Sequence, residues 1–261
     1  MKNKILISIE NIDNNTIEWL NNNDLGVELD FFSIPENIYI NLNESLSLYK
    51  KIVSKINNTI TMHGSFYDLN LIARDRMIID VAMFRVNQSI EIANYLKIKH
   101  IVFHCNYVHS TKNNYKEFWI QKQTEFWTKF KNKIEDENIT IYLENTREED
   151  YTYINQIIKN MNSNFKACYD TGHSNCFTNS KLKPVEWLQG YNQNVGYIHL
   201  HSNDSTTDQH ICFTDGNIDF SNFFETYNKM ENKPLLVIEV KKYEDVQKSL
   251  HNLKSILERM S

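Results

Sequence analysis

Short runs of apolar, β-branched residues alternate along the chain with longer segments in which apolar residues recur every three or four positions. The short runs are apolar throughout, as is typical of parallel strands covered on both faces. The longer segments have the periodicity of amphipathic helices. The predicted strands are Lys4–Ile9, Val27–Phe32, Thr59–His63, His100–Cys105, Ile139–Glu144, Phe165–Asp170, Gly196–His201 and Leu235–Val240. The predicted helices are Thr16–Asn22, Leu42–Ile56, Arg76–Leu96, Asn114–Glu137, Asp150–Asn162, Pro184–Gly190, Asp219–Met230 and Tyr243–Met260.

Strands and helices therefore alternate strictly, and no linker-like segment interrupts them. Eight right-handed βαβ units in about 250 residues are typical of a (β/α)8 barrel. An open, doubly wound sheet is the alternative, but it usually has a Gly-rich first turn, and neither GxGxxG nor GxxxxGK[ST] occurs in this sequence. We therefore expect an α/β protein in which residues 1–261 form a single (β/α)8 TIM barrel domain.

The composition narrows the class of protein further. The chain has only 6 Gly and 3 Pro, which excludes collagen-like and Gly-rich architectures. It has 35 Asn, which indicates that Asn makes turns where Gly is usual. A net charge of −5, without a long run of either sign, disfavours a nucleic-acid partner without excluding it. The 4 Cys form no CxxC pair, and we find no signal peptide and no membrane span. We expect a cytoplasmic protein with free thiols and no membrane partner.

Histidines and acidic residues follow the apolar runs of the predicted strands. In a (β/α)8 barrel the active site lies at the C-terminal ends of the strands, so these side chains are expected to converge. Few Lys or Arg residues are close to them in sequence, and buried carboxylates and imidazoles need a partner. Converging His, Asp and Glu side chains without cations are typical of a divalent metal site. The candidate ligands are His63, His104, Glu144, Asp170, His173, His199, Asp208, His210 and Glu239.

Three further residues are candidates for contact with a substrate. His201 shares a strand face with His199 and competes with it as the seventh-strand ligand. Phe66 follows His63 closely and is expected to line the pocket wall. Glu28 belongs to the second predicted strand, and it either reaches the substrate or is a loop charge.

The strand ends form an ordered series of short motifs. They are His63-Gly64-Ser65-Phe66, Phe103-His104, Leu143-Glu144-Asn145, Asp170-Thr171-Gly172-His173, His199-Leu200-His201-Ser202-Asn203, Asp208-Gln209-His210 with Gly216-Asn217-Ile218, and Ile238-Glu239. Over nearly the whole chain, this series resembles the xylose isomerase-like TIM barrel superfamily, which holds sugar (phosphate) isomerases and epimerases and also endonuclease IV. The isomerase branch implies one metal ion on Glu144, Asp170, His199 and Glu239. The endonuclease IV branch implies up to three zinc ions, with His63, His104, His173, Asp208 and His210 as further ligands.

The residues and the resemblance together predict a metal-dependent isomerase or epimerase acting on a small sugar, a sugar phosphate or a hydroxy-keto acid. A divalent ion (Mn, Mg, Co or Zn) would polarise the substrate, while Glu144 and Glu239 pass a proton through an enediolate. His173 would orient a hydroxyl or donate to the developing oxyanion. The alternative is an endonuclease IV-like, zinc-dependent phosphodiesterase that cleaves DNA at abasic sites. The sequence does not decide which metal ion is bound, whether the substrate is phosphorylated, or whether the protein forms a homo-oligomer.

Overall fold

The structure, a computed structural model, describes residues 5–260 and confirms the (β/α)8 barrel. Eight parallel strands pair in chain order, and the eighth pairs with the first, so that the sheet closes on itself. Lys4, the predicted first residue of the first strand, lies outside the described residues. The strands are β1 (Ile5–Ile9), β2 (Gly26–Leu29), β3 (Ile60–His63), β4 (His100–His104), β5 (Thr140–Glu144), β6 (Phe165–Asp170), β7 (Val195–Leu200) and β8 (Leu235–Ile238).

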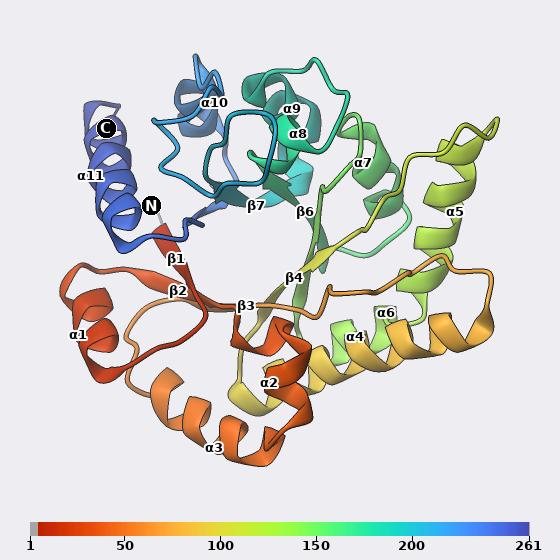
Figure 1. Ribbon diagram of the computed structural model, residues 1–261, viewed down its shortest axis with the longest axis horizontal. Coiled ribbons are helices and arrows are strands. Elements are labelled where there is room, and N and C mark those ends of the chain that lie inside the picture. Colours follow the sequence, from red (N-terminus) through yellow and green to blue (C-terminus); the bar gives the residue numbers. More distant parts are fainter. Residues whose placement is uncertain (1–4, 261) are drawn as a thin grey trace.

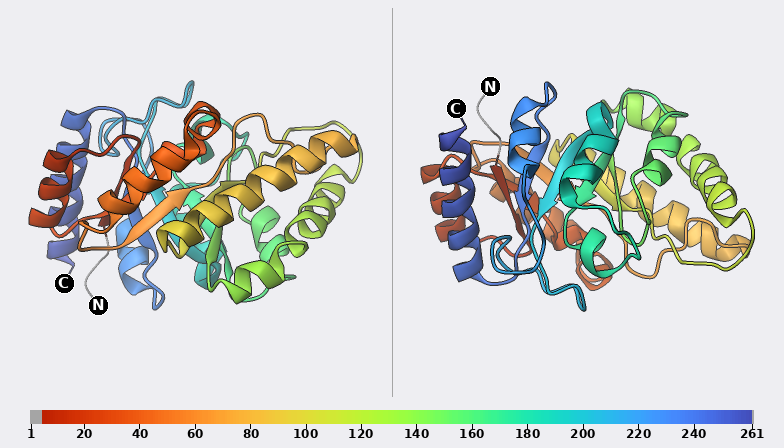
Figure 2. Two further views of the ribbon diagram at one scale, coloured as in Figure 1. Left: turned by 90° about the horizontal axis from the view of Figure 1, so that it is seen from below. Right: turned by 90° about the horizontal axis from the view of Figure 1, so that it is seen from above.

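The helices surround the strands on the outside of the barrel, as Figures 1 and 2 show from three directions. The α-helices are α1 (Asn14–Asn22), α2 (Pro35–Tyr39), α3 (Leu42–Val53), α4 (Arg76–Leu96), α5 (Tyr115–Thr128), α6 (Lys131–Asp136), α7 (Thr152–Ile158), α8 (His173–Cys176), α9 (Pro184–Tyr191), α10 (Phe223–Lys229) and α11 (Tyr243–Arg259). Two 3-10 segments, η1 (Phe31–Ser33) and η2 (Asn192–Asn194), complete the helical layer. None of the helices within residues 5–260 is long and apolar enough to cross a membrane.

Several helix boundaries differ from the prediction. The predicted helix at Asn114–Glu137 is two helices, because the chain turns between α5 and α6 and buries Phe130 against Phe126. α10 begins four residues later than predicted, since the side chain of Asp219 accepts a hydrogen bond from the backbone of Ser221 and forms a turn there. The short helices α2 and α8 span too few residues for apolar periodicity to reveal them.

Apolar side chains fill the inside of the barrel below the strand ends. A packed interior of this kind is usual for the fold. The candidate metal ligands lie above it, at the C-terminal ends of the strands. The members of the interior cluster are Leu6, Val102, Tyr142, Cys168, Tyr197, Leu235 and Val237.

The turns bear out the expected role of Asn. None of the six glycines has a positive φ, whereas six asparagines do. Glycine is needed instead where another group approaches closely: a β-carbon on Gly64 would stand 2.1 Å from the ring of Phe103. The four cysteines are free thiols, in agreement with the sequence. The asparagines with positive φ are Asn41, Asn106, Asn114, Asn138, Asn192 and Asn222.

Candidate metal centre

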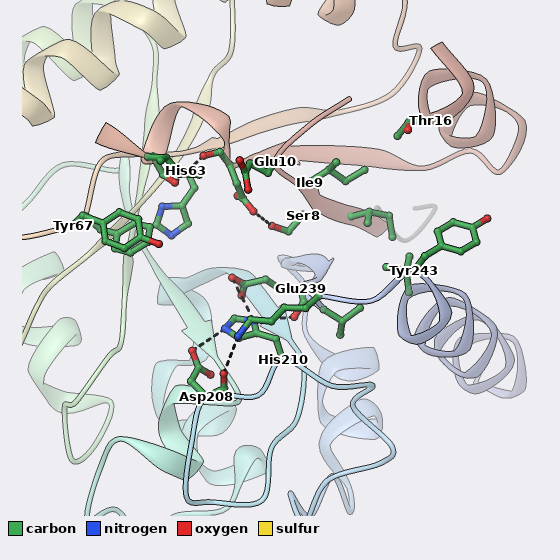
Figure 3. Close-up of a pocket in the computed structure, with 18 of the residues that line it drawn as sticks. Ser8, Ile9, Glu10, Thr16, His63, Tyr67, Asp208, His210, Glu239 and Tyr243 are labelled. Carbon is green, nitrogen blue, oxygen red and sulfur yellow. Dashed lines mark hydrogen bonds and ion pairs between the residues drawn. The ribbon is translucent and has the colours of Figure 1, made fainter. Parts of the chain in front are cut away.

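The strand ends bring the predicted polar side chains together at the mouth of the barrel. β3, β4 and β5 end in His63, His104 and Glu144, and β6 ends in Asp170. A cavity of about 860 Å³ opens above them, and Figure 3 shows His63, Asp208, His210 and Glu239 around it. The predicted residues that line this cavity are His63, Phe66, His104, His173, Asp208, His210 and Glu239.

Glu144 is enclosed by four imidazoles and is only 1% exposed. Its Oε2 lies 3.2 Å from Nε2 of His63 and 3.3 Å from Nε2 of His104. Its Oε1 lies 3.2 Å from Nδ1 of both His173 and His199. Two donors on one tetrahedral zinc ion, each about 2.0–2.1 Å from the metal, are separated by about 3.3 Å. The spacings from Oε2 to Nε2 of His63 and His104, and from Oε1 to Nδ1 of His199, therefore suit a carboxylate that holds a metal ion on each oxygen.

Three carboxylates surround a single nitrogen of His199. Nδ1 lies 3.2 Å from Oε1 of Glu144, 3.2 Å from Oε2 of Glu239 and 3.6 Å from Oδ2 of Asp170. An imidazole nitrogen carries at most one hydrogen, so hydrogen bonding does not account for all three contacts. The buried Oε2 of Glu239 indeed makes no hydrogen bond among the described residues. These four residues, called the central group below, fit a divalent cation, since a cation would balance their buried charges.

Two further sets of donors flank the central group. His63, His104 and Glu144 place one ligand atom each within 4.8 Å of one another. On the other side, Oδ2 of Asp208 lies 2.7 Å from Nε2 of His210 and 3.6 Å from Nε2 of His173. Oδ1 of Asp208 is buried without a hydrogen-bond partner among the described residues. The donors thus suffice for more than one metal ion.

The histidines of the site share one pattern of hydrogen bonding. Nδ1 of His63 lies 2.9 Å from the carbonyl oxygen of Gly64, and Nδ1 of His173 lies 3.0 Å from that of Asn145. Nδ1 of His210 lies 3.1 Å from the carbonyl oxygen of Glu239. A carbonyl oxygen only accepts, so each Nδ1 carries a hydrogen, and in the neutral ring Nε2 is the nitrogen that can bind a metal ion. In all three histidines this Nε2 faces a carboxylate, an orientation typical of metal-binding histidines.

His199 contacts more carboxylates of the central group than His201 does. His201 lies 3.0 Å from Oδ2 of Asp170, and its ring stacks on that of His210 at 4.0 Å. Its distance to Oε2 of Glu239 is 4.0 Å, which is longer than the 3.2 Å of His199. Nδ1 of His201 is buried and has no hydrogen-bond partner among the described residues. His201 therefore lies at the edge of the central group, beside the cavity-lining His210.

The two other predicted substrate contacts take different positions. Phe66 lines the cavity, and its ring centroid lies 4.3 Å from that of His104. Glu28 is fully buried and is absent from the cavity wall, because it lies behind His199. Sequence reasoning missed Ser8, whose hydroxyl donates to Asp30, and both of these residues line the cavity. The signal available was their position at the ends of the first two strands.

Burial and neighbouring charges shift the pKa values at the cavity. Burial raises the pKa of Glu239 to about 8, although the charges of His199 and His210 oppose the shift. Burial lowers the pKa of His210, but Glu239 and Asp208 outweigh burial and raise it to about 9. Metal ligands must be deprotonated, so protons and a metal ion compete for these two side chains near neutral pH.

Comparison with known proteins agrees with the fold. The sequence profile of the xylose isomerase-like TIM barrel family matches residues 17–258. The chain belongs to this family. Two relatives are the uncharacterized proteins MJ1614 and MJ1311 of Methanocaldococcus jannaschii. MJ1614 is 28% identical over 201 residues, which cover 76% of this chain and 77% of that protein. MJ1311 is 27% identical over 210 residues, which cover 76% and 70%.

Solved structures of the family's fold superpose on nearly the whole chain. A D-tagatose 3-epimerase-like protein has a TM-score of 0.81 at 22% identity and covers 98% of both chains. A protein of Thermus thermophilus, soaked with zinc chloride, has a TM-score of 0.83 at 17% identity and also covers 98% of both chains. A D-psicose 3-epimerase has a TM-score of 0.77 at 13% identity and covers 97% of this chain and 99% of its own. At these identities the likeness shows the barrel fold.

Proposed function

We propose that this chain is a divalent-metal-dependent isomerase or epimerase of a small sugar, a sugar phosphate or a hydroxy-keto acid, acting in the cytoplasm. The observation that carries the proposal is the central group, in which Glu144 and Glu239 each lie 3.2 Å from Nδ1 of His199. The family and its epimerase neighbours in structure support the same reaction class. A divalent ion held by this group would polarise the carbonyl and the adjacent hydroxyl of the substrate.

Proton transfer is assigned to the side chains that reach the substrate. Glu239 lines the cavity, so its carboxylate is placed to take a proton from the substrate and return it. Glu144 is covered by four imidazoles, so it is better placed to hold metal than to touch the substrate. His173 lines the cavity and contacts Glu144 through Nδ1, and we assign it the second proton transfer of the enediolate pathway.

A second candidate is the endonuclease IV-like phosphodiesterase, which the two flanking sets of donors favour. Glu144 with His63 and His104 forms one set, and Asp208 with His173 and His210 forms the other. Three ions would clamp a phosphodiester and activate a water molecule, whereas proton transfer at a sugar carbon needs only the central ion.

One experiment separates the two candidates. The purified protein is analysed for bound metal and then assayed in D₂O across ketoses, ketose phosphates and hydroxy-keto acids, and in parallel on a duplex with one abasic site. We expect deuterium incorporation at the carbon next to the carbonyl of one substrate class, lost on chelation and restored by a divalent ion. Nicking of the abasic duplex without deuterium exchange on any substrate would overturn the isomerase proposal.

A further inference from the structure

A carboxylate that neither proposed function uses lies behind the central group, inside the barrel. Glu28 of β2 is fully buried, and its two oxygens lie 3.1 and 3.2 Å from Nε2 of His199. Nδ1, on the other edge of the same ring, faces Glu144 and Glu239. The imidazole of His199 is therefore held between Glu28 on one side and the central group on the other.

A hydrogen bond from one neighbouring side chain, which a second side chain contacts in turn, holds Glu28 in place. The hydroxyl of Tyr197, in β7, donates to Oε2 of Glu28 at 2.6 Å. Oγ1 of Thr61, in β3, lies 2.7 Å from the same hydroxyl. All three side chains are fully buried, so water does not compete for these contacts. The resulting chain of contacts crosses the barrel interior and ends at His199.

His199 differs in this respect from the three histidines described above. In those histidines Nδ1, the ring nitrogen that does not face a ligand set, contacts a backbone carbonyl oxygen, which is an uncharged acceptor. In His199 the nitrogen that faces away from the central group is Nε2, and it contacts the carboxylate of Glu28 instead. Burying a carboxylate is unfavourable unless it is paired, and an apolar residue of similar volume would fill the barrel without that penalty. The charge of Glu28 therefore indicates a role toward His199.

We propose that Glu28 is a positioning residue that holds His199 with its hydrogen on Nε2 and its lone pair on Nδ1. An ionised carboxylate only accepts hydrogen bonds, so Glu28 favours the tautomer with the hydrogen on Nε2, and a divalent ion at the central group would take the lone pair of Nδ1. The partner of one ring nitrogen fixes the tautomer and raises the basicity of the other nitrogen toward a metal ion. This inference rests on the metal ion of the proposed function, but it does not depend on which substrate is converted.

The test compares Glu28→Gln with the wild type by three measurements. Zinc affinity is measured by competition with a chelator, the tautomer of His199 by ¹⁵N-correlated NMR, and folding by thermal unfolding. The amide of Gln donates as well as accepts, so we expect a mixed tautomer and a loss of zinc affinity of about 10- to 100-fold. Tyr197→Phe removes the hydroxyl that contacts Glu28 and Thr61 but keeps the carboxylate of Glu28, so it should cause a smaller loss of zinc affinity. The matched control is Tyr142→Phe, because Tyr142 belongs to the same interior cluster as Tyr197. Its hydroxyl contacts His100 and none of the proposed ligands, so its removal should leave zinc affinity unchanged.

The outcomes separate this inference from the proposed function. A folded Glu28→Gln variant with zinc affinity within threefold of the wild type overturns the inference. If that variant does not fold, a wild-type His199 with its hydrogen on Nδ1 overturns it equally. If Glu28→Gln weakens zinc binding as expected but the wild type exchanges no substrate hydrogen, the proposed function alone fails. If the wild type binds no divalent ion, both fail.

Discussion

Gly172 lies directly against the ring of His201. A β-carbon on Gly172 would stand 2.0 Å from Cε1 and 2.5 Å from Nδ1 of that ring. The ring is fully buried, lies 3.0 Å from Asp170 and stacks on His210, so it has no free direction in which to move. The glycine between Asp170 and His173 is therefore required for close packing within the site.

Gly172→Ala should displace His201 and, through it, Asp170 and His210. We expect a loss of stability of about 1–3 kcal/mol, as for other overpacked sites, together with weaker metal binding. Chemical denaturation and metal analysis measure the two effects. Gly190→Ala is the matched control. Gly190 lies in helix α9, away from the ligands, and its added β-carbon would stand 2.2 Å from the ring of Tyr151. Equal loss of metal in both variants would contradict this account.

Glu239→Gln should abolish turnover while the barrel stays folded. The variant keeps the shape of the side chain but cannot carry a proton, so we expect a fall in kcat of at least about 100-fold. Deuterium exchange into the substrate and circular dichroism are the measurements. Glu244→Gln, at the start of α11, is the control and should behave as the wild type. A Glu239→Gln variant that keeps a tenth or more of the activity would remove Glu239 from the mechanism.

Asp208→Asn tests the flanking donors separately from the central group. The substitution removes a charge that faces Nε2 of both His173 and His210. Metal content should fall relative to the wild type, while the central group keeps its ion and isomerase activity falls by less than about 10-fold. Elemental analysis and deuterium exchange on the same sample decide the result. Complete loss of exchange would show that the flanking set is needed for proton transfer.

Glu148 gives a pH-dependent prediction for stability. Its side chain is fully buried, and burial raises its pKa from 4.5 to about 7, although backbone N–H groups, among them that of Thr146, favour the ionised form. Between these two values the unfolded chain loses the proton and the folded protein keeps it, so wild-type stability falls as pH rises from about 4.5 to about 7. The full shift corresponds to about 3 kcal/mol.

Glu148→Gln should therefore be more stable than the wild type at pH 8, by up to about 3 kcal/mol, and equal to it near pH 4. The variant keeps an acceptor oxygen for the backbone N–H of Thr146. Urea denaturation at several pH values measures the difference. Glu149→Gln, at the exposed neighbouring position, is the control and should change little. A stability difference that does not vary with pH would contradict the assigned cause.

Lys97 offers a stabilising change far from the site. It ends α4 with φ 60°, a left-handed conformation that disfavours residues with a β-carbon. Lys97→Gly should raise the free energy of unfolding by about 1 kcal/mol without changing activity. The matched control is Lys129→Gly at the end of α5, where φ is −66° and glycine should destabilise instead. Stabilisation by both substitutions would show that the conformation of residue 97 is not the cause.

The sequence predicts the barrel and the convergence of His, Asp and Glu side chains at its mouth, because both depend on local patterns. Each apolar run is a strand, and the polar residue that follows it must lie at the mouth of the barrel. The position of Glu28 depends instead on which side chain faces it across the barrel, and His199 is far from it in sequence. The burial of Glu148 is hidden for a similar reason, since it belongs to a run of polar residues that is typical of exposed loops.

The closure of β8 onto β1 has a consequence for how the site forms during synthesis. The donors leave the ribosome in chain order from His63 onward, and Glu239, just after β8, is the last of them. Until β8 pairs with β1, the nascent chain carries several imidazoles and carboxylates that are not yet held in one geometry. In the proposed metalloenzyme, capture of the central ion and closure of the sheet should therefore reinforce each other as the final steps of folding, so metal starvation would leave newly made chains exposed to proteases.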